Sequence, residues 1–154
     1  MRAVAWLCLA CLCAALAADD QDAKRLPDGH GKDLVVRTCL QCHGSANFRK
    51  ARENRAEWAG TVADMIDRGA KGTDDEFEIV LDYLSQNFGP DSKVNVNTAP
   101  LEELKSILGL TEDESKSVIA WRDANGPFRE WQDLQKVAGI DAKKIEAKKN
   151  WIAF

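Results

Sequence analysis

Five residues in the first third of the chain constrain its fold more than any other part of the 154-residue sequence. They read Cys39-Leu40-Gln41-Cys42-His43, the C-x-x-C-H pattern of covalent haem c attachment. Two cysteines three positions apart lie on one helical turn, so both sulfur atoms can reach the vinyl groups of one porphyrin. The adjacent histidine then supplies the proximal ligand of the iron. The sequence therefore predicts one covalent haem c on Cys39 and Cys42, with His43 on the metal.

The second axial position has two candidates. Met65 is the only methionine beyond the first residue, and it shares one side of an expected helix with Trp58, Val62 and Ile66. A thioether ligand raises the potential of a haem, so Met65 is the predicted distal ligand. His30, in a glycine-flanked loop, is the alternative. Met65 could instead fill the core, which would leave the iron open for sensing or peroxide chemistry.

Other readings of the cysteine pair fit the sequence less well. A structural zinc site needs four ligands, and a thioredoxin-like redox pair follows a strand in an α/β pattern, which is absent here. A plain disulfide would not require His43 beside it.

The first seventeen residues predict export. Arg2 is followed by an apolar run of about fourteen residues, and Ala15-Leu16-Ala17 is typical of a signal-peptidase site. The run is shorter than the roughly 20 residues of a membrane span. We therefore expect a Sec-type signal peptide at 1–17, a periplasmic or otherwise exported protein, and no stable membrane span after cleavage. An uncleaved anchor is the alternative. Cleavage would leave Cys39 and Cys42 as the only cysteines.

Apolar spacing predicts an all-α protein in two parts, with no strand. Capping boxes are expected at Asn54 with Glu57, at Thr73 with Glu76, and at Thr111 with Glu114. Asn97 or Thr98 is expected to cap another helix, and Asp141 is expected to cap the last one. Leu134 and Val137 are expected to belong to a short helix between these two. The turn at 89–92 separates a haem domain at 28–90, preceded by a lead-in loop at 18–27, from a second domain at 91–154.

The first part resembles small class I-like monohaem cytochromes c, in particular the haem domains of quinohaemoprotein amine dehydrogenases. The matching features are Cys39 to Gly44, the Trp58 helix with Met65 and Gly69, and the closing segment from Tyr83 to Pro90. The resemblance implies that the domain accepts electrons from a periplasmic dehydrogenase and that Met65 is the axial ligand.

The second part resembles the helix-hairpin-helix domain of ComEA-type competence proteins. The matching segments are Val94 to Ala99, Glu103-Leu104, Trp121-Arg122, Gly126 to Phe128, Asp133-Leu134 and Val137 to Ile140. In that family each hairpin turn reads glycine-x-glycine, and the resemblance implies that its backbone N–H groups grip DNA phosphates without reading sequence.

Both hairpin turns depart from that pattern. Thr111 and Asp141 replace the second glycine, and three carboxylates begin at Glu112. Residues 91–154 hold ten Lys and Arg against eleven Asp and Glu, a net charge of −1. These features argue against DNA binding by the second domain. Four lysines on the last helix argue the other way, although such a run is usually a solvated face. They are Lys143, Lys144, Lys148 and Lys149.

The main hypothesis is an exported electron carrier, with no catalytic residues, whose second domain docks a protein. Its partner would be a redox protein, either a periplasmic dehydrogenase or a terminal acceptor, and Trp131 and Trp151 are candidate contacts. One alternative is a DNA-binding or DNA-uptake protein that uses the helix-hairpin-helix domain. The other is a haem-based sensor.

Overall fold

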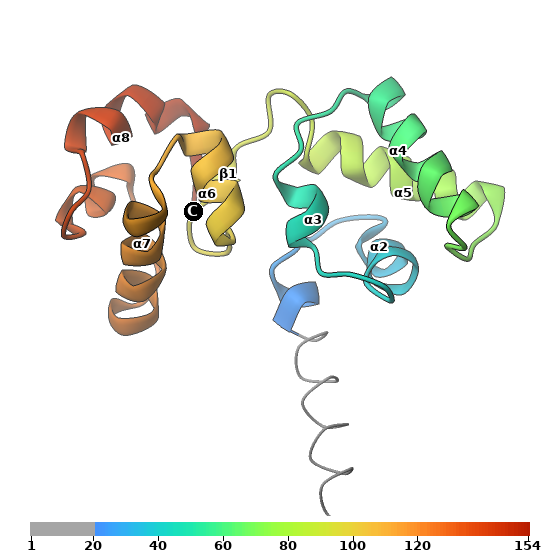
Figure 1. Cartoon of the computed structure of the whole chain (residues 1–154), viewed down its shortest axis with the longest axis horizontal. Coiled ribbons are helices and arrows are strands. Elements are labelled where there is room, and N and C mark those ends of the chain that lie inside the picture. Colours follow the sequence, from blue (N-terminus) through green and yellow to red (C-terminus); the bar gives the residue numbers. More distant parts are fainter. Residues whose placement is uncertain (1–20) are drawn as a thin grey trace, which may run out of the picture.

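The computed structural model describes residues 21–154, so the signal-peptide prediction lies outside the described part. The chain forms two helical parts that lie side by side, joined by the segment that leads into β1 (Figure 1). One buried apolar cluster uses residues 26–88 and the other uses residues 94–152. The predicted division after residue 90 falls between them, although its position stays a prediction.

The N-terminal part contains α2 (Lys32–Cys39), α3 (Ala46–Arg49), α4 (Arg55–Asp67) and α5 (Asp74–Asn87). The capping boxes predicted at the starts of α4 and α5 are both present. Helices α2 and α4 pack on α5. The turn into α2 requires glycine, because Gly31 has a φ of 95° and a Cβ there would lie 2.9 Å from the Cβ of Tyr83. This glycine keeps α2 close to α5.

The C-terminal part is built from two helical hairpins. Its helices are α6 (Leu101–Leu108), α7 (Glu112–Asn125), the 3-10 helix η1 (Trp131–Lys136), α8 (Ala142–Lys148) and the 3-10 helix η2 (Lys149–Trp151). The predicted capping box of α7 is present. The fully buried side chains of the C-terminal part include Leu104, Leu108, Val118, Phe128 and Ile145.

Two short strands were not expected from the sequence. β1 (Val94–Asn95) and β2 (Ile152–Ala153) pair in parallel, with Val94 opposite Ile152. Two-residue strands have no periodicity to detect, so the prediction of no strand was wrong for these four residues. The prediction of a mainly helical chain is confirmed.

The expected start of α6 was also wrong. Its N-cap is Pro100 rather than Asn97 or Thr98. The side chain of Asn97 is engaged elsewhere, because it accepts from Phe128 N at 2.7 Å and donates to Phe128 O at 3.0 Å. Because Asn97 bonds to a residue 31 positions away, its side chain does not cap α6.

Two apolar residues lie in other places than predicted. Ile66, expected on the inner side of α4, is 41% exposed. Val137 follows η1 as its C-cap rather than belonging to a helix, although it is buried.

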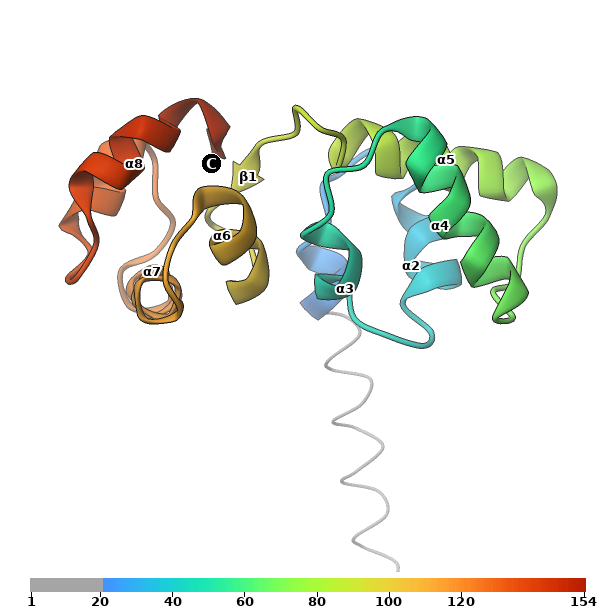
Figure 2. The same ribbon diagram turned by 45° about the horizontal axis from the view of Figure 1, so that its top comes forward.

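The two parts contact each other through α3 and α6, which face one another in both views (Figures 1 and 2). Helix α3 lies in a polar, arginine-rich stretch of the sequence, residues 44–55, yet Phe48 and Arg49 are buried in it. Within residues 21–154, no helix is long and apolar enough to cross a membrane.

Candidate nucleic-acid interface and apolar cavity

The first hairpin turn joins α6 to α7. Gly109 ends α6 in the left-handed conformation with a φ of 69°, which favours glycine. Thr111 then caps α7, because its side chain accepts from Glu114 N at 3.2 Å. In return, the Glu114 carboxylate accepts from Thr111 N at 2.6 Å. The residue that replaces the second glycine therefore forms a capping box.

The second hairpin turn joins η1 to α8, with Gly139 at a φ of 84°. Asp141 caps α8 as predicted, and its Oδ1 accepts from Lys143 N at 2.9 Å and from Lys144 N at 3.4 Å. A side-chain carboxylate thus occupies the N-terminus of α8, the position where an anion would otherwise bind.

Glu114 connects the two turns. Its carboxylate accepts from Asp141 N at 3.3 Å and from Lys144 Nζ at 2.7 Å, in addition to Thr111 N. Burial alone would raise the pKa of Glu114, but the hydrogen bonds from Lys144, Thr111 and Asp141 together lower it to about 2. Glu114 therefore remains charged at neutral pH and holds both hairpins in one arrangement.

Four backbone donors of the two turns are consequently satisfied within the chain. Carboxylates of Glu114 and Asp141 hold the N–H groups of Thr111, Asp141, Lys143 and Lys144. A phosphate would have to displace these carboxylates to reach those N–H groups. Side chains near the turns are therefore the better candidates for a phosphate contact.

Lysines beside tryptophans provide such side chains next to the second hairpin. The Nζ of Lys148 lies 5.9 Å from the centre of the Trp151 ring, and the Nζ of Lys149 lies 5.7 Å from that of Trp131. Both distances are those of cation–π contacts. Both tryptophans are half-buried against the core, so only part of each ring is available for contact with a partner.

Lys143, Lys148 and Lys149 form what we call the lysine face. Lys143 and Lys149 are exposed and Lys148 is half-buried. Lys144, the fourth lysine of the run, is paired with Glu114. Three of the four lysines singled out in the sequence therefore remain for an external anion.

A cavity of about 140 Å³ lies in the N-terminal part, between α2, α3, α4 and α5. Its walls are mainly apolar, and its lining includes Cys39, His43, Phe48, Trp58 and Met65. The structure therefore brings three of the four predicted haem-site residues to one cavity.

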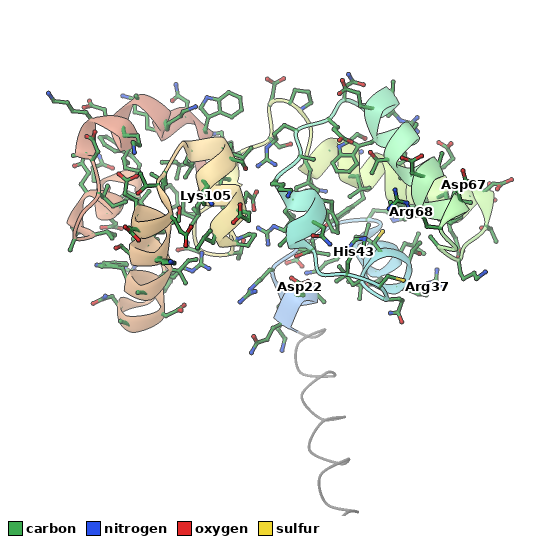
Figure 3. All side chains as sticks on the ribbon, viewed as in Figure 1. Asp22, Arg37, His43, Asp67, Arg68 and Lys105 are labelled. Atoms are coloured by element: carbon green, nitrogen blue, oxygen red, sulfur yellow. The ribbon has the colours of Figure 1, made fainter. Side chains whose placement is uncertain are left out.

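The remaining predicted site residues lie elsewhere. Cys42 is exposed on the turn after α2, and His30 is exposed on the loop before α2, outside the cavity lining. Burial raises the pKa of the Cys39 thiol to about 11, so this sulfur is protonated at neutral pH. Figure 3 shows His43 beside α2 and α3, where its Nδ1 lies 3.2 Å from Gly44 O.

The haem assignment rests on the C-x-x-C-H motif and on this arrangement. Within residues 21–154, no group of three or more His, Cys, Asp and Glu side chains is placed to hold a bare metal ion. The arrangement fits an apolar prosthetic group, because His43 and Met65 both line an apolar cavity. Haem attachment stays a prediction.

One functional residue was missed at the sequence level. Glu114 was assigned only to a capping box and to the acidic run of the first turn, whereas it also bridges to Asp141 and Lys144. No local pattern signals a contact between residues 30 positions apart.

Comparisons with known proteins concern mainly the C-terminal part. Residues 89–153 match the helix-hairpin-helix motif family. ComE operon protein 1 of Bacillus subtilis (strain 168) is 42% identical over 64 residues, which are 42% of this chain and 31% of that protein. Kinesin-like protein KIF22 of Xenopus tropicalis is 40% identical over 95 residues, 61% of this chain and 12% of that protein.

A third relative is endonuclease/exonuclease/phosphatase family domain-containing protein 1 of Danio rerio, 39% identical over 57 residues, which are 37% of this chain and 10% of that protein. The chain thus spans less than a third of the length of each of these three relatives. No solved structure matches the chain.

These matches overturn the main interpretation of the sequence. The electron-carrier hypothesis, with its redox partner, is wrong, because the matching family and the ComE relative instead favour the alternative of DNA binding or DNA uptake. The weight given to the altered turns against DNA was therefore too large. Residues 89–153 of this chain therefore resemble the helix-hairpin-helix motif family, and the chain is similar to ComE operon protein 1 over 64 residues.

Proposed function

We propose that the protein acts outside the cytoplasm in DNA binding or DNA uptake. It binds DNA through its helix-hairpin-helix domain. The observation that carries the proposal is the match of residues 89–153 to this family, together with 42% identity to ComE operon protein 1 over 64 residues. Such domains hold the phosphate backbone and do not read bases. We therefore expect binding that is independent of sequence and strongly dependent on salt.

The contacts within the domain indicate which groups would meet the DNA. Glu114 and Asp141 occupy the backbone donors of both hairpin turns. The lysine face lies directly after the second turn, and its charges are not paired with carboxylates in the way that Lys144 is paired with Glu114. The DNA backbone is therefore expected to lie along α8 and η2, on Lys143, Lys148 and Lys149.

Fluorescence anisotropy with a labelled 20-base-pair duplex tests this proposal. The wild-type protein is compared with a triple variant, Lys143→Ala, Lys148→Ala and Lys149→Ala, over a series of salt concentrations. We expect the variant to bind at least about tenfold more weakly, with a slope of log affinity against log salt that is shallower by about 2 to 3.

A matched control removes three exposed cations from the N-terminal part, Lys50→Ala, Arg68→Ala and Lys71→Ala. It changes the net charge equally and should leave the affinity nearly unchanged. Wild-type protein that does not bind duplex DNA at physiological salt would contradict the proposal. Equal losses in both variants would show attraction by net charge alone, without a binding face.

We further propose that the cavity of the N-terminal part holds a covalently attached haem. Its support is the placement of Cys39, His43 and Met65 on the walls of one apolar cavity. Cys39 and Cys42 would hold the porphyrin, His43 and Met65 would face the iron, and Trp58 and Phe48 would exclude water from it. A bound haem would supply an iron centre and apolar surface to a part of the chain with a small core.

Intact mass and haem staining test this proposal on protein exported by a host that attaches haem c. The expected result is a haem that survives denaturation in the wild type and is lost in Cys39→Ala with Cys42→Ala. Met65→Ala should keep the haem but change its visible spectrum. Wild-type protein that emerges without haem from such a host, in which a known haem c protein is matured, would refute the proposal.

A further inference from the structure

A second cavity, of about 240 Å³, lies at the seam between the two parts. One wall comes from residues 24–28, Arg49, Asn87 and Phe88, and the other from Lys93, Asn95, Thr98 and Glu103. Unlike the apolar cavity that Cys39, His43 and Met65 line, it is lined largely by polar side chains. We call it the seam cleft.

The carboxylates of the seam cleft are already neutralised. Glu103 is 2% exposed, and its two oxygens accept from Arg49 and from Arg52, each at 3.0 Å. Asp28 is paired with Lys32 at 2.8 Å. Buried Arg49 and half-buried Arg52 thus share one carboxylate, so these three side chains carry a net positive charge beside the cleft.

Further cations stand at its rim. Arg25 and Lys93 are exposed and come from opposite walls. Burial lowers the pKa of the Arg49 guanidinium, while Glu103 and Asp22 raise it and the positive charge of Arg25 lowers it. Burial likewise lowers the pKa of Arg122, while Asp123 raises it and the charges of Arg25 and Arg49 lower it. The positive charges of Arg25, Arg49 and Arg122 therefore lie close enough to act on one another, and together they would attract an anion to the seam.

Neutral groups complete the arrangement. Asn95 accepts from Asn97 N with its Oδ1 at 2.9 Å, so its NH2 group is the donor that it offers to the cleft. Arg49 donates to Arg25 O at 2.7 Å and to Thr98 O at 3.3 Å, which fixes the two walls relative to each other. The positively charged cleft is therefore a rigid feature rather than a chance meeting of mobile side chains.

We infer that the seam cleft binds a phosphate group of the nucleic-acid backbone, with Arg25 and Lys93 as the contacting side chains. The inference rests on the proposed DNA binding and extends it, because these residues come from both parts of the chain and only Lys93 falls inside the matched family segment. The N-terminal part would then contribute directly to DNA affinity. Free inorganic phosphate has the same chemistry and is the alternative occupant to be distinguished.

The test compares the affinity of the full chain for a labelled duplex with that of Arg25→Ala combined with Lys93→Ala. We expect about a tenfold loss, and a slope of log affinity against log salt that is shallower by about 2, one unit for each cation removed from the phosphate backbone. Lys50→Ala with Lys71→Ala is the control of equal charge and should bind like the wild type. Both substituted residues of the test variant are exposed, so its thermal unfolding should match that of the wild type.

Three outcomes would overturn the inference. Wild-type protein that fails to bind DNA removes the proposed function and this site with it. Wild-type binding that is unchanged in the test variant removes the seam cleft alone and leaves the proposed function in place. Titration with inorganic phosphate, followed by NMR shifts of Arg25 and Lys93, separates the sources. Phosphate binding without any loss of DNA affinity in the variant would make the cleft a site for the free anion only.

Discussion

Glu114 joins two turns that lie about 30 residues apart in the chain, through hydrogen bonds to Asp141 N and Lys144 Nζ. The same carboxylate closes the capping box of α7. A single ionised side chain therefore fixes the geometry of the hairpin pair and occupies donors that could have held a phosphate. Stability and anion binding compete for the same N–H groups at this residue.

Glu114→Gln is expected to lower the free energy of unfolding at pH 7 by about 1 to 2 kcal/mol, after allowance for solvent screening. The folded pKa of about 2 lies below the ordinary glutamate value, so the ionised group stabilises the fold above about pH 4. That contribution is lost as the pH falls towards 2. Urea unfolding between pH 2 and 7 should show a flatter dependence in the variant.

Glu146→Gln is the control for this prediction, because Glu146 is exposed on α8 in the same domain. Its unfolding curves should follow those of the wild type at every pH. An equal flattening in both variants would show that the acid sensitivity arises from the overall charge rather than from Glu114.

At the level of elements, the capping residues were predictable and the tertiary arrangement was not. Asn54 and Thr73 were identified from partners three residues away, and the structure confirms both capping boxes. The start of α6 was misplaced because Asn97 bonds to Phe128, far along the chain. The burial of Arg49 was equally hidden, since a charged residue is normally expected at the surface.

The candidate sites likewise contain some features that the sequence predicts and others that it does not. The C-x-x-C-H spacing made the haem prediction accessible from the sequence, and the structure adds the cavity that Cys39, His43 and Met65 share. Glycine-containing turns revealed the helix-hairpin-helix fold, but not that Glu114 connects them. Patterns within one turn of helix are readable because their partners are near in sequence, whereas contacts between hairpins depend on packing.

The glycine that ends α6 gives a prediction for this element. Gly109→Ala is expected to destabilise the protein by about 1 kcal/mol, because Gly109 has a φ of 69° that an alanine adopts at a cost. Nothing lies within 4 Å of a Cβ placed there, so the cost comes from the backbone alone. Thermal unfolding measures it.

Gly60→Ala is the matched comparison. Gly60 lies inside α4, has no positive φ, and has equally open space around its Cβ position. Alanine should therefore stabilise α4 by up to about 1 kcal/mol. Opposite signs for the two substitutions are the expected outcome, and equal signs would contradict the backbone argument.

On the scale of the whole molecule, two separate cores are held together by a buried ion pair. Arg49 and Glu103 are each 2% exposed and join α3 to α6. Removal of Arg49 would leave the buried Glu103 paired with Arg52 alone and would also remove the hydrogen bonds of Arg49 to Arg25 O and Thr98 O. The relative placement of the two parts therefore depends on this contact more than on any exposed pair.

Arg49→Ala is expected to cost about 3 kcal/mol and to separate the unfolding of the two parts. Calorimetry should show one transition in the wild type and two in the variant. Arg55→Ala removes an exposed arginine that pairs with Glu78 and Asp82, and it should leave the wild-type transition nearly unshifted. A single, barely shifted transition in Arg49→Ala would show that the seam does not couple the parts.

The parallel pairing of β1 with β2 has a mechanical consequence. The strands stand at the entrance and the exit of the helix-hairpin-helix domain, with Val94 opposite Ile152 and Asn95 opposite Ala153. Tension applied along the chain would pull β1 backwards and β2 forwards, so their hydrogen bonds would be loaded together in shear. The force would not reach the hairpins until the hydrogen bonds between β1 and β2 broke. The surface formed by α8 and η2 would therefore keep its structure while the chain is under tension.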